Sequence, residues 1–154
     1  MNDCNILIRE FREEDAEAVS CIIQHNLTQV NSKDYPEKII DNMCKIFTSD
    51  FVLKISQKRN MYVATNNDMV VGIASIEDDT IYTVFIKLEY HGKGIGKKLM
   101  KFLEDFAVSN GLQLLRLPAS ITAVKFYEKL GYYAISEVES EEYGRDIIME
   151  KSLI

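Results

Sequence analysis

The residues most suited to chemistry lie within Val84–Met100, where a β-rich run is followed by a glycine-rich loop and an amphipathic helical pattern. The glycines are Gly92, Gly94 and Gly96. Glycine lacks the Cβ atom that keeps a ligand away from the backbone, and it permits positive φ, so successive N–H groups can converge on an anion. The first turn of a helix adds unpaired N–H groups and the positive end of its dipole. The sequence therefore predicts a binding loop for a ligand that carries a diphosphate.

Two common phosphate-binding motifs do not fit this loop. A P-loop requires Gly-x4-Gly-Lys-Ser/Thr, but His91 stands at the first glycine position and Lys98 replaces the magnesium-binding hydroxyl. A dinucleotide fingerprint has the spacing G-x-G-x-x-G soon after the first strand of a βαβ unit. Here the spacing is G-x-G-x-G, the loop lies past mid-chain, and Lys97 occupies the third glycine position. Both motifs are excluded by position and by residue type.

Read as His91-Gly92-Lys93-Gly94-Ile95-Gly96, the loop resembles the acetyl-CoA signature of the GNAT-type N-acetyltransferase superfamily. That signature is Gln/Arg-x-x-Gly-x-Gly/Ala, so His91 departs from it at the first position. The segment Ala119–Tyr132 resembles the later family motif, in which a helix carries A-x-x-F-Y and ends at Gly-Phe/Tyr. The N-terminal IREFREEDAEAV resembles the opening strand and first helix of the family. The resemblance covers nearly the whole chain in the expected order.

The resemblance implies acetyl-CoA as co-substrate. Its pyrophosphate would contact backbone N–H groups of the glycine loop, with the neighbouring lysines available to its phosphates. Its pantetheine arm would lie in a gap where two parallel strands splay apart, and would pair with the backbone there. The residues expected at the cofactor are Phe85, Ile86, Leu88, His91, Gly92, Lys93, Gly94, Ile95, Gly96, Lys97 and Tyr127.

Acetyl transfer to an amine requires a neutral amine and an acid for the thiolate leaving group. Tyr127 matches the family tyrosine that lies close to the CoA sulfur and is the expected acid; the alternative is a purely structural aromatic. Several family members carry a base early in the strand before the loop, but Thr80 stands at that position. Glu77, which ends the preceding strand beside the turn residues Asp78 and Asp79, is the expected base. An ordered water is the alternative proton acceptor.

We therefore expect an acetyl-CoA-dependent N-acetyltransferase that moves an acetyl group to a primary amine by direct attack in a ternary complex. The acceptor is expected to be a small-molecule amine or a peptide amine. The alternative is a non-catalytic GNAT-like module that binds CoA or acyl-CoA or regulates a partner, which the missing carboxylate at Thr80 keeps open. Dimers are frequent in the family, and the C-terminal hairpin is the expected contact of a homodimer.

Composition limits the other classes of function. The 154 residues, 47% hydrophobic and 27% charged, predict one globular domain over residues 1–154. No apolar run approaches the ~20 residues of a membrane span, and MNDCNILIRE lacks the pattern of a signal peptide, so we expect a cytoplasmic protein without a membrane partner. A net charge of −6 argues against nucleic acid as a partner. Three widely spaced cysteines and two histidines predict reduced thiols and no metal site.

The elements that must position these residues follow from periodicity and turn residues. A meander, a βαβ unit and a closing hairpin predict an α+β fold with a mixed, mainly antiparallel central sheet flanked by helices. The resemblance implies the same GNAT-like fold. Strands are expected at Asn5–Arg9, Met61–Thr65, Val70–Ile76, Thr80–Ile86, Leu112–Leu117, Tyr132–Val138 and Asp146–Lys151. Helices are expected after Asp15, after Pro36, and at Ser49–Ile55, Gly94–Ser109 and Thr122–Leu130.

Overall fold

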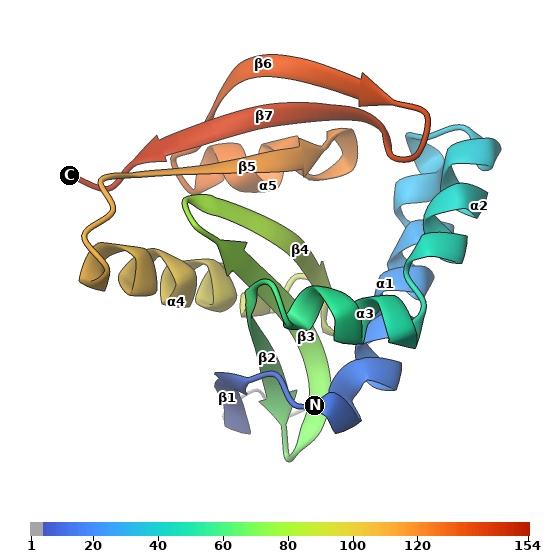
Figure 1. Cartoon of the computed structure of the whole chain (residues 1–154), viewed down its shortest axis with the longest axis horizontal. Helices are drawn as coiled ribbons and strands as arrows, with labels where there is room; N and C mark the ends of the chain where they lie inside the picture. The colour runs from blue at the N-terminus through green and yellow to red at the C-terminus, as the bar shows by residue number, and fades with distance from the viewer. Residues whose placement is uncertain (1–4) are drawn as a thin grey trace.

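The computed structural model describes residues 5–154 as one seven-stranded sheet with helices on both faces (Figure 1). The strand order is β1-β2-β3-β4-β5-β7-β6, and only the β4–β5 neighbours are parallel within the described residues. The expected mixed, mainly antiparallel sheet is thus confirmed. The strands are β1 (Ile6–Glu10), β2 (Asn60–Asn66), β3 (Met69–Glu77), β4 (Thr80–Ile86), β5 (Leu114–Ser120), β6 (Tyr133–Ser140) and β7 (Gly144–Ser152). The helices are α1 (Ala16–Gln29), α2 (Glu37–Ile46), α3 (Ser49–Ser56), α4 (Ile95–Ser109) and α5 (Val124–Lys129).

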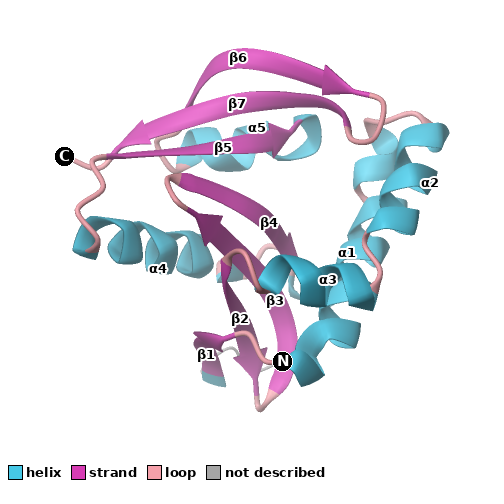
Figure 2. Ribbon diagram, viewed as in Figure 1, coloured by secondary structure: helices cyan, strands magenta, loops and turns pink. Residues whose placement is uncertain are grey.

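The sheet consists of two parts that separate between β4 and β5 (Figure 2). The two strands pair through Thr80 and Arg116, and the Arg116 N–H donates to the Asp79 carbonyl at 3.0 Å. Beyond this point β4 and β5 diverge toward their C-terminal ends (Figure 2). The resemblance implied such a splay, and the structure contains it.

A bulge in β4 accompanies the divergence. Ile73 pairs with Phe85 and Ser75 with Tyr82, so one residue of β3 faces two residues of β4. Thr83, inside the bulge, has φ of 56°, which is unusual for a β-branched residue and costs about 1–3 kcal/mol. Bulges bend the strand that carries them and increase its twist. The bulge therefore turns the C-terminal half of β4 away from the direction of β5.

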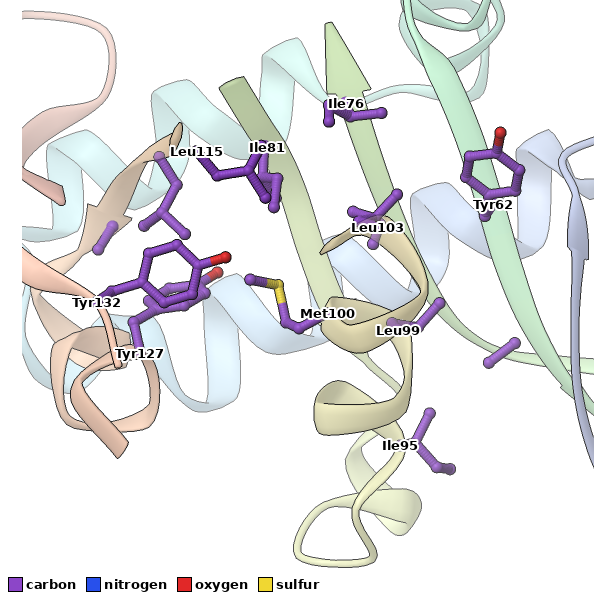
Figure 3. Close-up of a cluster of buried hydrophobic side chains, with 14 of the residues drawn as sticks. Tyr62, Ile76, Ile81, Ile95, Leu99, Met100, Leu103, Leu115, Tyr127 and Tyr132 are labelled. Atoms are coloured by element: carbon purple, nitrogen blue, oxygen red, sulfur yellow. The ribbon is translucent and has the colours of Figure 1, made fainter. Parts of the chain in front are cut away.

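Each face of the first sheet part is covered by its own set of helices. Successive residues of β2 alternate between the two hydrophobic clusters, with Met61 and Val63 on one face and Tyr62 and Ala64 on the other. Helices α1, α2 and α3 cover the first face and α4 covers the second, while α5 packs against β5 of the other sheet part. Figure 3 shows the second cluster, where the side chains of α4 point at the strands. The fully buried face of α4 repeats every four residues: Ile95, Leu99, Leu103 and Ala107.

Two helices differ in detail from the expectations. The helix expected at Ser49–Ile55 extends to Ser56, and Thr48 caps it by accepting a hydrogen bond from the Phe51 N–H at 3.3 Å. The expected helix at 122–130 is split into a 3₁₀ turn, η5 (Ile121–Ala123), and the shorter α5. Within the described residues, no helix is long and apolar enough to cross a membrane.

Asp15 lies directly before α1 as its N-cap residue, and its carboxylate contacts Arg9 and Arg12. It accepts two hydrogen bonds from the Arg9 guanidinium, at 2.8 and 2.9 Å, and one from the Arg12 backbone N–H at 2.8 Å. The residue is only 4% exposed. Burial alone would raise the pKa of Asp15, but the contacts with Arg9 and Arg12 hold it below its usual value. The carboxylate thus joins β1 to the start of α1.

We predict that Asp15→Asn lowers the free energy of unfolding by about 1–3 kcal/mol at pH 7, because a charge-assisted pair becomes a weaker contact in a buried place. The folded-state pKa lies below the unfolded value of about 3.9, so the contribution is present above that pH and is lost as pH falls through the folded pKa. Urea denaturation at pH 7 measures the loss of stability, and the same measurement at about pH 2–3 tests whether the wild type and the variant converge once Asp15 is protonated.

The matched control is Glu14→Gln, whose exposed carboxylate lies 3.9 Å from the Arg12 guanidinium. This change should alter the free energy of unfolding by less than about 0.5 kcal/mol. An Asp15→Asn variant as stable as the wild type at pH 7 would show that the contacts of this carboxylate do not contribute to the free energy of unfolding.

Candidate active site

The divergence of β4 and β5 opens a cavity of about 500 Å³. Its walls come from the C-terminal half of β4, the glycine loop, the end of β5 and the start of α5. The end of α1 closes the opposite side through Asn26 and Val30. The site is therefore built from segments that lie far apart in the sequence and meet where the sheet is open.

The loop glycines have two different structural roles. Gly92 and Gly94 have φ of 76° and 81°, and a Cβ atom added at either would meet nothing within 4 Å. These two positions therefore require the left-handed conformation and leave open space above the loop. Gly96, in the first turn of α4, is required by packing, since a Cβ atom there would lie 3.0 Å from the Phe126 Cζ. The loop and α5 approach each other closely only because residue 96 has no side chain.

The electrostatics of the loop favour an anion. Gly94 is the N-cap of α4, and the first turn of this 15-residue helix contains no acidic residue. The positive end of the helix dipole and the unpaired N–H groups thus have no anionic side chain beside them in that turn. Lys97 lines the cavity and Lys93 lies exposed on the same loop. This arrangement can hold a phosphate group through backbone N–H donors.

The structure brings together most of the residues predicted at the cofactor. All of them line the cavity except Leu88, which lies in the 3₁₀ turn η4 (Leu88–Tyr90), and Lys93. Asn26, Asn31, Ser120 and Thr122 were missed, and they also line it. The Thr122 hydroxyl is buried without a hydrogen-bond partner among residues 5–154. Asn26 could have been found from its position within the apolar stripe of a helix, where a polar side chain needs a partner.

The backbone of Ile86, predicted to pair with pantetheine, is already engaged. Its carbonyl accepts a hydrogen bond from the Asn26 side-chain amide at 2.8 Å and lies 2.8 Å from His91 Nε2. A carbonyl oxygen has two lone pairs, so the two contacts satisfy it. His91 is exposed and belongs to the loop, whereas Asn26 is buried. A ligand amide that donates to Ile86 must therefore displace the His91 ring.

A second cavity of about 260 Å³ adjoins the first. The two cavities share Tyr127 and Phe85, together with Asn31, Val84, Ser120 and Ala123. The walls of the second cavity include aromatic residues from the α2–α3 region and from β4, and they also include Arg59 and Asp146. These six shared residues mark the boundary where the two cavities meet, which we call the passage.

Tyr127 stands in this passage. The residue is 7% exposed, and its ring packs edge-on against Phe126 and Tyr132, with centroids 5.1 and 5.9 Å apart. Burial raises the pKa of Tyr127 far above its usual value. The hydroxyl is therefore a proton donor throughout the physiological pH range. This placement fits the predicted acid and adds a structural role in the core of the second cluster.

Glu77, the predicted base, lies apart from this passage. Its carboxylate is 3.4 Å from the Arg59 Nε, and the residue lines neither cavity. The predicted loop and Tyr127 line the first cavity, and a different carboxylate, Asp146, lines the second. Residues 5–154 contain no cluster of His, Cys, Asp or Glu that could hold a metal ion.

Comparison with known proteins agrees with this geometry. Residues 15–153 match the family model described as "Acetyltransferase (GNAT) domain". A relative described as an uncharacterized N-acetyltransferase, YafP of Escherichia coli K12, is 28% identical over 140 residues, which cover 91% of this chain and 89% of that protein. The peptidyl-lysine N-acetyltransferase YjaB of Salmonella typhimurium is 24% identical over 141 residues, or 91% of this chain and 92% of that protein.

Solved structures share the whole fold. A GCN5-related N-acetyltransferase from Rhodopseudomonas palustris matches with a TM-score of 0.91 and 25% identity, covering 99% of this chain and 98% of that one. The PaiA N-acetyltransferase of Thermoplasma acidophilum, solved in complex with coenzyme A, matches with a TM-score of 0.78 and 22% identity over 96% of this chain and 98% of that one.

We predict that Gly96→Ala lowers the free energy of unfolding by about 1–2 kcal/mol, because overpacking against Phe126 outweighs the better helix propensity of alanine. In a Phe126→Leu background the aromatic Cζ atom is gone, so the same change should be neutral or stabilising. Denaturant unfolding of the four proteins forms a double-mutant cycle. An equal effect of Gly96→Ala in both backgrounds would exclude this contact as the reason for the glycine.

Proposed function

Since the chain belongs to the GNAT acetyltransferase family, we propose that it uses acetyl-CoA to acetylate a primary amine by direct attack in a ternary complex. The observation that carries this proposal is the passage at Tyr127, where the glycine-loop cavity and a second cavity meet. A two-substrate reaction requires two adjoining sites with one opening between them. The acetyl group would occupy that opening.

The first cavity suits coenzyme A on three grounds. Its loop presents backbone donors for a pyrophosphate, through Gly92–Lys97, and carries the exposed Lys93. The open space above Gly92 and Gly94 would be reduced by any side chain there. The buried Thr122 hydroxyl, which has no hydrogen-bond partner among residues 5–154, offers a polar contact to a ligand. The pantetheine arm would run along β4, beside Phe85 and Ile86, and Leu88 would support it from η4.

The chemistry proposed for the passage needs few groups. The amine nitrogen attacks the thioester carbon, a carbon–nitrogen bond forms, and the carbon–sulfur bond breaks. Tyr127 gives its hydroxyl proton to the departing thiolate and recovers one from solvent. Backbone N–H groups near Val84–Ile86 polarise the thioester carbonyl. Alignment of the two reactants in adjoining cavities supplies the largest contribution, up to about 7–11 kcal/mol.

The proposal also includes a base that takes the proton of the amine and a homodimeric assembly. Glu77 can act as the base only through intervening water, because its carboxylate is turned toward Arg59. A homodimer through the C-terminal hairpin is supported by exposed apolar residues of the edge strand β6: Tyr133, Ile135 and Val138. We place the protein in the cytoplasm.

We predict that Gly94→Asp abolishes acetyl-CoA binding, because a carboxylate at the loop repels the diphosphate, whereas Gly94→Asn retains part of it. Both residues tolerate positive φ and have open space at this position, so both variants should fold. Thermal unfolding with acetyl-CoA at about 100 times Kd should show a stabilisation of about 2.7 kcal/mol in the wild type. Equal shifts for the two variants would contradict a diphosphate at this loop.

We predict that Tyr127→Phe lowers turnover by about ten-fold to a thousand-fold while the thermal shift with acetyl-CoA is retained. Tyr132→Phe is the matched control: it touches Tyr127 but lies outside both cavities, and its hydroxyl donates to Glu104 at 2.8 Å. Thiol release from acetyl-CoA in the presence of primary amines measures turnover. Undiminished turnover in Tyr127→Phe would make Tyr127 a structural residue, and tight acetyl-CoA binding without thiol release would favour the non-catalytic module.

A further inference from the structure

The second cavity has walls that suit an apolar molecule. Met43, Phe47 and Phe51 line it from the α2–α3 region, and Tyr82 and Tyr143 contribute further rings. A volume of about 260 Å³ is small for a ligand pocket, which suits a compact molecule. Removal of an apolar body from water into these walls is favourable in proportion to the buried area. The cavity therefore favours a small acceptor whose body is aromatic or aliphatic.

One ionisable group of this cavity is a carboxylate that has no cationic partner among residues 5–154. Asp146, near the start of β7, pairs with Ser120 of β5 and Val138 of β6 in the sheet. The two arginines that could compensate its charge are engaged with other carboxylates, Arg59 with Glu77 at 3.4 Å and Arg145 with Glu137. Asp146 is thus available to a cation that enters the cavity.

The one polar side chain that holds Asp146 gives it little compensation. The Tyr35 hydroxyl lies 3.4 Å from its carboxylate but only 2.7 Å from the Arg145 carbonyl oxygen. A phenol has a single proton, so the shorter contact takes most of it. The same hydroxyl accepts a hydrogen bond from the Ile121 N–H at 2.9 Å, which fixes its position. Tyr35 therefore orients Asp146 without neutralising it.

The titration of Asp146 agrees with this geometry. Burial raises its pKa to about 6, against the lowering effect of the Tyr35 contact. The groups around it are Tyr35, whose own pKa is raised to about 12, Tyr143, whose pKa is also raised, and Arg59 across the cavity. The two tyrosines stay neutral at pH 7. Asp146 is then mostly ionised at pH 7, and its pKa is close enough to this pH for the carboxylate to accept a proton and release it again.

We propose that the second cavity is the acceptor site for a primary amine on a small aromatic or aliphatic body, and that Asp146 holds the incoming ammonium group and removes its proton. This inference rests on the proposed function. One ammonium proton passes to the Asp146 carboxylate, and the freed lone pair attacks the thioester carbon. The carbon–sulfur bond breaks, the thiolate takes the Tyr127 proton, and Tyr127 recovers one proton from solvent. The amide nitrogen and Asp146 each lose one proton to solvent. The net products are the N-acetyl amine, free thiol and one proton.

The test measures kcat/KM for thiol release with 2-phenylethylamine between pH 5.5 and 9, using the full chain. For the wild type, kcat/KM should rise through about pH 6, as Asp146 ionises, and then level off. In Asp146→Asn, kcat/KM at pH 7 should fall at least ten-fold and rise steadily up to pH 9, because only the neutral amine can react. Asp146→Glu should recover part of the rate and the levelling. Asp105→Asn, an exposed change on α4, is the matched control and should keep the wild-type profile.

Other outcomes would contradict either the role of Asp146 or the class of acceptor. An unchanged profile in Asp146→Asn, or loss of the low-pH rise in Glu77→Gln instead, would overturn the role of Asp146. Activity with spermidine or an N-terminally blocked lysine peptide, but not with 2-phenylethylamine, would overturn the acceptor class. Thermal shifts with acetyl-CoA separate these failures from a failure of the proposed function: Asp146 lies outside the first cavity, so Asp146→Asn should keep the wild-type shift. No shift in the wild type itself would end both proposals.

Discussion

The structure depends on the separation of two parallel strands that pair only where they begin. Thr80 and Arg116 join β4 to β5, and the strands then diverge, so a sheet that would otherwise be continuous is open at one end. Backbone groups exposed by such an opening must find other partners, because an unpaired buried carbonyl or N–H is costly. At Ile86 the side chains of Asn26 and His91 supply them. The opening is therefore stabilised by specific side-chain contacts, and both cavities lie beside it.

The opening is coupled to the walls of the second cavity through a strained residue. Thr83 holds positive φ inside the β4 bulge, and the Arg59 guanidinium donates to its hydroxyl at 3.2 Å while lying 4.1 Å from the centre of the Tyr82 ring. Glu77 pairs with the same guanidinium. A carboxylate that appears from the sequence to be near the reacting groups thus contributes to the support of the bulge. Local strain of this kind persists only when the surrounding contacts stabilise it.

The sequence predicts the features that local residue patterns encode, and misses those that depend on distant contacts. The β4 boundaries, the glycine loop and the start of α4 follow from turn residues and periodicity within a few positions. The splay came only from the family resemblance, because no alternation of apolar residues reports the angle between two strands. Asp146 was missed as a site residue, since its surroundings are set by Tyr35, more than a hundred positions away in the chain. Glu77 is close to β4 along the chain, but its side chain points toward Arg59, so the residue lines neither cavity.

We propose that the gap between β4 and β5 receives the cofactor, with its diphosphate on the glycine loop and its thiol at Tyr127. A crystal structure of the full chain with coenzyme A tests this most directly. We expect pyrophosphate oxygens about 3 Å from the backbone nitrogens of Gly92–Lys97, pantetheine between the diverging strands, and sulfur beside the Tyr127 hydroxyl. Coenzyme A bound elsewhere on the protein, or β4 and β5 paired along their whole length in the complex, would contradict it.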